Sequence, residues 1–125
     1  MCGIAGIIDF RGQANSITIL ESMLRTISYR GPDESGIYNS QLATIGNVRL
    51  SIIDLQTGQQ PLSDSSGRYW IVFNGEIFNY RELRQDIDKH GVIFKTHSDT
   101  EVLVNLLPQF PVVEDLTIEY YPVSS

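Results

Sequence analysis

The chain has 125 residues, 42% of them hydrophobic and 19% charged, a balance typical of one globular domain rather than a disordered segment. Its formal net charge of -6 disfavours nucleic acid and anionic membranes as main partners, so we expect a small-molecule ligand. No apolar run reaches the ~18 residues of a membrane span, and the N-terminus lacks the basic region of a signal peptide. The single cysteine excludes an internal disulfide, and we expect a cytoplasmic protein.

The first predicted elements are a strand and a helix. Residues 2–10 form an apolar, glycine-spaced run followed by turn residues, which indicates a buried strand. A helix follows, capped by Ser16 and ended by Gly31-Pro32. Its core face carries apolar residues at helical spacing, namely Ile17, Leu20, Met23, Leu24 and Ile27.

The middle of the chain predicts strands and a loop. Residues 35–39 and 42–53 are typical of strands, the second interrupted around Gly46-Asn47. Residues 56–67 are polar and predict a loop. Residues 69–73 are aromatic and β-branched, so a further strand is expected there.

The later part predicts two helices with a short strand, residues 92–96, between them. Each helix is marked by a capping pair and a terminator: Asn79 with Glu82 before Gly91, and Ser98 with Glu101 before Pro108. For His90, at a helix end, and His97, in a turn, solvated or structural roles are favoured.

The order of elements predicts an α+β fold with antiparallel hairpins. The chain has no G-x-G-x-x-G or G-x-x-x-x-G-K-[ST] phosphate loop and no His/Cys set with zinc spacing. We therefore expect no metal site and no cofactor in this chain.

Cys2 permits two interpretations. A lone cysteine on an apolar strand is often a packing residue. If Met1 is removed, however, Cys2 carries both a thiol and a free α-amine, and an α-amine titrates near pH 7.7 to 8.0. An appreciable neutral fraction would then take the thiol proton, so Cys2 could act as a nucleophile without a histidine partner.

A series of short motifs decides between these interpretations. They are Cys2-Gly3-Ile4-Ala5-Gly6, Arg30-Gly31-Pro32-Asp33, Arg49-Leu50-Ser51-Ile52-Ile53-Asp54, Asn74-Gly75-Glu76-Ile77-Phe78-Asn79-Tyr80 and Ser98-Asp99-Thr100-Glu101. In this order they resemble the N-terminal glutaminase domain of glutamine-hydrolysing asparagine synthetase, a class II glutamine amidotransferase. The resemblance implies an N-terminal-nucleophile hydrolase fold, an αββα sandwich, and favours the catalytic interpretation of Cys2.

The resemblance also implies a reaction. The Cys2 thiolate would attack the side-chain amide of L-glutamine, the Cys2 amine would protonate the departing ammonia, and water would hydrolyse the glutamyl thioester. Asn74 and the Gly75 N–H match the family's oxyanion hole. A bare turn is the alternative role for Asn74-Gly75.

The resemblance also implies which residues would bind a free amino acid, because they match the family's substrate pocket. Arg49 would bind the α-carboxylate in a two-pronged contact, and Asp99 would hold the α-ammonium. The pocket is further lined by Glu76, Leu50, Ile52 and Ile53. The alternatives are a surface ion pair for Arg49 and a favourable helix-dipole position for Asp99.

Two departures from the family pattern are visible. Asn47 stands where the family usually has histidine, which puts a supporting hydrogen bond in doubt. The similarity also fades after Leu107, so we expect an incomplete sandwich over residues 1–107 and a divergent tail over residues 108–125. An incomplete sandwich exposes a sheet edge, which favours self-association or a partner chain.

The leading hypothesis is therefore a glutaminase that needs a separate synthetase domain or chain to use the ammonia. ATP and Mg²⁺ would belong to that absent synthetase domain. One alternative is a catalytically inactive module that binds glutamine or a partner. Another is an acylase-type hydrolase of the same fold, which the charged Arg49 and Asp99 disfavour.

Overall fold

The computed structural model describes residues 2–11, 16–50 and 59–109. Its main sheet is antiparallel and has the strand order β1-β3-β2, formed by β1 (Gly3–Ile8), β2 (Glu34–Asn39) and β3 (Ala43–Arg49). The register pairs Ile4 and Gly36 with Asn47, so β3 runs unbroken through the middle of the sheet. The expected interruption at Gly46-Asn47 is wrong, because both residues pair on both sides.

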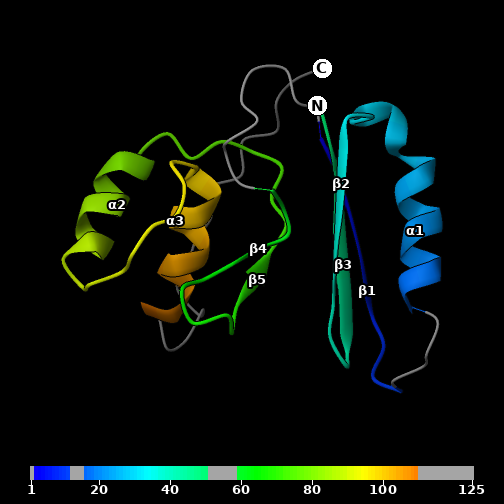
Figure 1. Ribbon diagram of the computed structural model, residues 1–125, viewed down its shortest axis with the longest axis horizontal. Coiled ribbons are helices and arrows are strands. Elements are labelled where there is room, and N and C mark those ends of the chain that lie inside the picture. The colour runs from blue at the N-terminus through cyan, green and yellow to red at the C-terminus, as the bar shows by residue number, and fades with distance from the viewer. Residues whose placement is uncertain (1, 12–15, 51–58, 110–125) are drawn as a thin grey trace.

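Helix α1 (Ser16–Thr26) packs on one face of this sheet (Figure 1). Leu20, Leu24 and Val48 form the buried cluster beneath it, as the helical spacing predicts for the two leucines. The prediction is wrong for two residues of the expected core face, because Ile17 is 43% exposed and Met23 is 39% exposed. The helix ends at Thr26, before the expected Gly31-Pro32 terminator, and a 3-10 turn (Ser28–Arg30) follows it.

The other face of the sheet is only partly covered by the described residues. Ile4 and Ile8 are 49% and 69% exposed, so the expectation of a buried first strand holds for one face alone. One contact that crosses from this face to the next layer is the stacking of Tyr38 on Trp70, with ring centroids 4.0 Å apart.

The next layer is a short hairpin of β4 (Leu62–Ser63) and β5 (Trp70–Ile71). Strand β4 lies within the segment expected to be a loop, and β5 is shorter than the strand expected over residues 69–73. Buried Asp64 closes the hairpin by accepting hydrogen bonds from Ser66 and from the Tyr69 N–H. Residues 51–58 lie outside the described residues.

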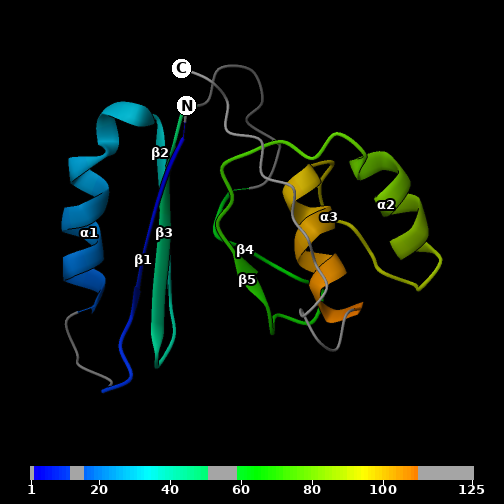
Figure 2. The same ribbon diagram turned by 180° about the vertical axis from the view of Figure 1, so that it is seen from behind.

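Helix α3 (Asp99–Leu106) packs on the hairpin, and α2 (Tyr80–Asp88) packs on α3. Seen from behind, α3 again lies between the hairpin and α2 (Figure 2). The Glu101 N–H donates to Ser98 Oγ, which confirms the cap of α3, whereas Asn79 makes no side-chain cap on α2. The expected strand over residues 92–96 is wrong, since no strand is present there.

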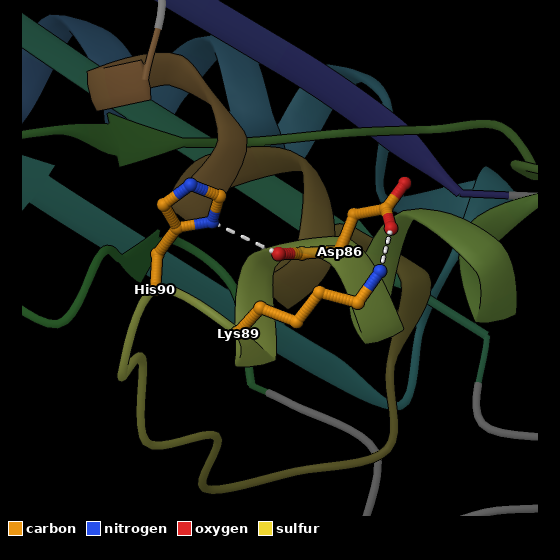
Figure 3. A network of polar contacts seen from close by, with 3 residues as sticks. All are labelled: Asp86, Lys89 and His90. Carbon is orange, nitrogen blue, oxygen red and sulfur yellow. Dashed lines mark hydrogen bonds and ion pairs between the residues drawn. The ribbon is translucent and has the colours of Figure 1, made fainter.

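The end of α2 carries a surface network (Figure 3). Lys89 Nζ lies 2.8 Å from Asp86 Oδ1, and the His90 ring contacts the Asp86 carbonyl oxygen. The hydrogen bond from Lys89 holds the pKa of the Asp86 carboxyl below its usual range. All three residues are exposed, so the solvated or structural role favoured for His90 fits its position. Gly91, with φ of 79°, then ends the turn after α2.

Candidate active site

A cleft of about 430 Å³ lies where the sheet, the segment after β5 and the start of α3 meet. This volume is in the range of small-molecule sites. The cleft is lined by six of the residues singled out from the sequence: Cys2, Arg49, Asn74, Gly75, Glu76 and Asp99. Leu50 is half-buried and does not line the cleft, and Ile52 and Ile53 lie outside the described residues.

Cys2 is half-buried and immediately precedes β1. Its carbonyl oxygen accepts a hydrogen bond from Asn74 Nδ2 at 3.0 Å and one from Arg30 Nε at 3.3 Å. The two donors come from segments far apart in the chain, and both hold the Cys2 backbone next to β1. The contribution of Arg30 was not predicted from its motif.

Arg49 ends the central strand β3 and lies opposite the start of β2. Gly31 packs directly on its backbone: a Cβ atom at position 31 would lie 2.5 Å from Arg49 backbone atoms. The Asp33 N–H also donates to the Arg49 carbonyl oxygen at 3.1 Å. The Arg30-Gly31-Pro32-Asp33 motif therefore braces the end of the strand that carries Arg49.

Asn74, Gly75 and Glu76 are exposed and follow β5. Positive φ occurs in the described residues only at Gly67 and Gly91, so Asn74-Gly75 does not form a turn with left-handed backbone. An amide nitrogen carries two hydrogens, and one from Asn74 is used on Cys2.

Asp99 is the first residue of α3, where the helix dipole favours a carboxylate. Its Oδ2 accepts from the Ile77 N–H at 2.9 Å, and its Oδ1 accepts from the Thr100 N–H at 2.8 Å. The carboxylate therefore joins the segment after β5 to the start of α3 while it lines the cleft. Asp99 thus has the helix-dipole position considered from the sequence, and its place in the cleft is compatible with the predicted substrate contact.

Glu101 fixes the wall of the cleft formed by the residues before α3. It is only 3% exposed, and its carboxylate accepts from the Lys95 and Thr96 N–H groups at 2.7 Å each and from Thr96 Oγ1 at 2.5 Å. In the predicted capping box this side chain would reach back to Ser98, and it does not. The hydrogen bonds from the Lys95 and Thr96 backbone to the Glu101 carboxylate hold the segment that leads to Asp99.

Several cleft residues were missed by sequence reasoning: Asn47 as a lining residue, Gln60, Phe73, Tyr80, His97, Ser98 and Thr100. Gln60 and Phe73 carry no reactive group and belong to none of the recognised motifs. His97 was assigned a solvated or structural role because it lies in a turn and the chain has no His/Cys set with zinc spacing. Proximity to the Asp99 motif is the signal that would have found it.

Asn47, which stands where the family usually has histidine, leaves one hydrogen-bond acceptor without a partner among the described residues. It is 4% exposed, and its Oδ1 is buried without a hydrogen-bond partner in the described part of the chain. A buried acceptor left unsatisfied typically costs ~1–3 kcal/mol.

A second cavity of about 340 Å³ lies beside α1 and β2, and within the described ranges it shares no lining residue with the cleft. Across residues 2–11, 16–50 and 59–109, no group of three or more His, Cys, Asp or Glu could hold a metal ion. In the same residues no helix is long and apolar enough to cross a membrane.

Comparison with known proteins places the chain in a family. The chain is 43% identical over 107 residues to asparagine synthetase (glutamine-hydrolyzing) 1 of Bacillus subtilis, a match that covers 83% of this chain and 17% of that protein. It is 44% identical over 109 residues to the second B. subtilis asparagine synthetase, covering 85% of this chain and 14% of that protein. Asparagine synthetase B of Escherichia coli is 39% identical over 109 residues, covering 85% and 19%.

The chain thus spans less than a fifth of the length of these curated relatives. The resemblance to glutamine-hydrolysing asparagine synthetases, inferred from the motifs, is confirmed. A family profile described as "Glutamine amidotransferase domain" matches residues 1–113, and the chain therefore belongs to the glutamine amidotransferase domain family.

Proposed function

We propose that the chain hydrolyses L-glutamine to glutamate and ammonia, with Cys2 as the nucleophile. The observation that supports this most is the meeting of Cys2, Arg49, Asn74 and Asp99 in one cleft from four separate parts of the chain. The family match and the relatives, whose names describe glutamine-hydrolysing enzymes, support the same substrate.

The proposed reaction begins once Met1 is removed and Cys2 becomes the N-terminal residue. The Cys2 amine takes the thiol proton, the thiolate forms a C–S bond to the amide carbon, and the carbonyl becomes an oxyanion. The second N–H of the Asn74 amide and the Gly75 backbone N–H stabilise this oxyanion. The C–N bond then breaks as the Cys2 ammonium returns its proton to the nitrogen, and water hydrolyses the thioester to glutamate.

Substrate recognition in this proposal uses the two charged side chains of the cleft. Arg49 binds the α-carboxylate and Asp99 binds the α-ammonium, because Asp99 Oδ2, which accepts from the Ile77 N–H, can accept a second hydrogen bond. Glu76 lines the same cleft, and Ile52 and Ile53, which lie outside the described residues, are proposed to complete the pocket; Leu50 follows Arg49 but does not line the cleft. The reaction needs no metal or organic cofactor, since the thiol, the amine and the N–H donors supply its chemistry.

The layer order supports an N-terminal-nucleophile hydrolase sandwich. Helix α1, the main sheet, the hairpin, and the pair α3 and α2 follow one another across the molecule, which is the order of an αββα fold (Figure 1). We propose that residues 1–107 form this domain and that residues 108–125 are a divergent tail. The exposed Ile4 and Ile8 support a partner surface on the first sheet, for a second copy or another chain.

The relatives carry the name of an enzyme that makes asparagine, and we propose that the ammonia released here serves a synthetase domain or chain that uses ATP and Mg²⁺. A cytoplasmic location fits the single cysteine. The alternative of an inactive glutamine-binding or partner-binding module is not better supported, because the exposed Ile4 and Ile8 are equally compatible with an active domain that has a partner.

The direct test is the release of glutamate and ammonia from L-glutamine by the purified chain, after mass spectrometry has verified the removal of Met1. We expect equal amounts of both products, no turnover of D-glutamine, and loss of activity to background in Cys2→Ala. Arg49→Gln should raise KM, because it removes the charge on the carboxylate contact. Binding of glutamine without turnover by the processed chain would contradict the proposal and support the inactive module.

A further inference from the structure

Gln60 joins two segments of the cleft wall through the two ends of one side-chain amide. Its Oε1 accepts a hydrogen bond from the Phe73 N–H at 2.7 Å, and its Nε2 donates to Thr100 Oγ1 at 3.4 Å. Gln60 is half-buried and lines the cleft. It belongs to none of the motifs that identify the family, and the proposed reaction assigns it no role.

Each partner of Gln60 is adjacent to a residue of the proposed site. Phe73 directly precedes Asn74-Gly75, the proposed oxyanion donors. Thr100 directly follows Asp99, and both its N–H and its hydroxyl donate to Asp99 Oδ1, at 2.8 and 3.4 Å. One amide thus connects the group that would meet the reacting carbonyl to the group that would meet the α-ammonium.

The backbone of Gln60 is seated against the sheet that carries Cys2 and Arg49. A Cβ atom at Gly36 would lie 1.9 Å from the Gln60 carbonyl oxygen, so only glycine allows this approach. Gly36 pairs with Asn47 on β3, two residues before Arg49 on the same face of the strand. Gln60 therefore contacts or adjoins all three parts of the cleft.

We infer that Gln60 is a positioning residue that fixes the spacing between the oxyanion donors and the ammonium-binding carboxylate. This inference rests on the proposed glutaminase function and adds a determinant of substrate length to it. A spacing suited to glutamine excludes asparagine, which is one methylene shorter, from simultaneous contact with both groups. Small displacements matter here, since a shift of about 1 Å at a reacting group can cost ~10²-fold in rate.

The two hydrogen bonds of Gln60 predict separable kinetic effects. Gln60→Leu removes both, so kcat for glutamine should fall about 10- to 100-fold and KM should rise about tenfold. Thr100→Val removes the Gln60 contact on the Asp99 side together with the hydrogen bond from the Thr100 hydroxyl to Asp99 Oδ1, so it should raise KM about three- to tenfold with kcat within about twofold of wild type. Because both substitutions break the Gln60–Thr100 contact, their effects on KM should be less than additive in the double variant.

A matched control is provided by the exposed neighbour Gln59. Gln59→Leu makes the same chemical change one residue away and should leave kcat and KM unchanged. The ratio of kcat/KM for glutamine to that for asparagine gives a second readout. It should fall at least tenfold in Gln60→Leu and stay constant in Gln59→Leu.

The experiment measures these constants for the full chain with Met1 removed, normalised to the folded fraction found by denaturant unfolding. The inference is overturned if Gln60→Leu matches Gln59→Leu, or if it lowers stability while kcat, KM and the substrate ratio stay at wild-type values. If Gln60→Leu does not fold, an unchanged KM in Thr100→Val overturns it. Absence of glutamine turnover in the wild-type chain is a different failure, which refutes the proposed function itself.

Discussion

The two sides of the cleft are stabilised in different ways. On the side of the main sheet, α1 is held by the apolar cluster of Leu20, Leu24 and Val48. On the side of the hairpin and α3, the buried apolar residues Ile87, Val102 and Val104 are accompanied by four buried polar residues, namely Asp64, Thr100, Glu101 and Asn105. The difference indicates that both sides are stabilised by apolar burial, and that the buried polar residues of the second side also set the precise shape of the cleft wall.

The largest expected effect is on the side of the main sheet. Leu20 is fully buried, so Leu20→Ala should lower the free energy of unfolding by about 2–5 kcal/mol through lost burial and a residual cavity. Because Leu20 lies on the far side of the sheet from the cleft, KM for glutamine per folded molecule should stay at the wild-type value. Denaturant unfolding and steady-state kinetics measure the two quantities, and a raised KM would show that the two sides are not separable.

A smaller loss of stability with a clear effect on the site is expected for Glu101→Gln. An amide keeps one acceptor oxygen, so at least one buried N–H donor among Lys95 and Thr96 loses its partner, at a cost of about 1–3 kcal/mol. The wall that leads to Asp99 should then loosen and KM should rise. Glu82→Gln, on the exposed first turn of α2, is the control and should change neither.

Substitution of Asn47 should change the free energy of unfolding in the opposite direction. Asn47→Leu replaces a buried acceptor that lacks a partner in the described residues with an apolar group of similar size. Unfolding free energy should therefore rise by about 1 kcal/mol. A fall in stability would mean that the Asn47 amide is satisfied in solution, by ordered water or by residues outside the described part of the chain.

The smallest effect concerns pH and Asp64. Burial raises the pKa of this carboxyl, but hydrogen bonds from the Ser66 hydroxyl and from the backbone N–H groups of Tyr69, Ser66 and Arg68 outweigh it, and the pKa lies below 3.8. A lowered folded-state pKa gives stability that is present above pH 3.8 and is lost as pH falls through the lowered value. Asp64→Asn should flatten this acid dependence, measured as unfolding midpoints between about pH 6 and pH 2.

The same contrast explains how much could be predicted from sequence. The strand at the N-terminus, helix α1 with Leu20 and Leu24, and the Ser98 cap of α3 follow from periodicity and local capping chemistry. The site residues Cys2, Arg49, Asn74, Gly75, Glu76 and Asp99 were found through motifs, and the structure brings them into one cleft.

The side of the hairpin and α3 could not be predicted in the same way. Residues 92–96 have the composition of a strand, but the Lys95 and Thr96 N–H groups donate to the Glu101 carboxylate rather than to a neighbouring strand. Gln60 contacts Thr100, which lies 40 residues away in the chain. Side-chain to backbone bonds of this kind carry no periodic signal, so only the assembled fold reveals them.

The central claim is that Cys2 is an activated nucleophile within a glutamine-binding cleft. The most direct test is the intact mass of the purified chain before and after treatment with a glutamine-mimicking diazoketone, with Cys2→Ala as control. The account predicts loss of Met1 and one adduct that requires Cys2 and is prevented by excess L-glutamine. A retained Met1, or a folded chain that forms no adduct, would contradict it.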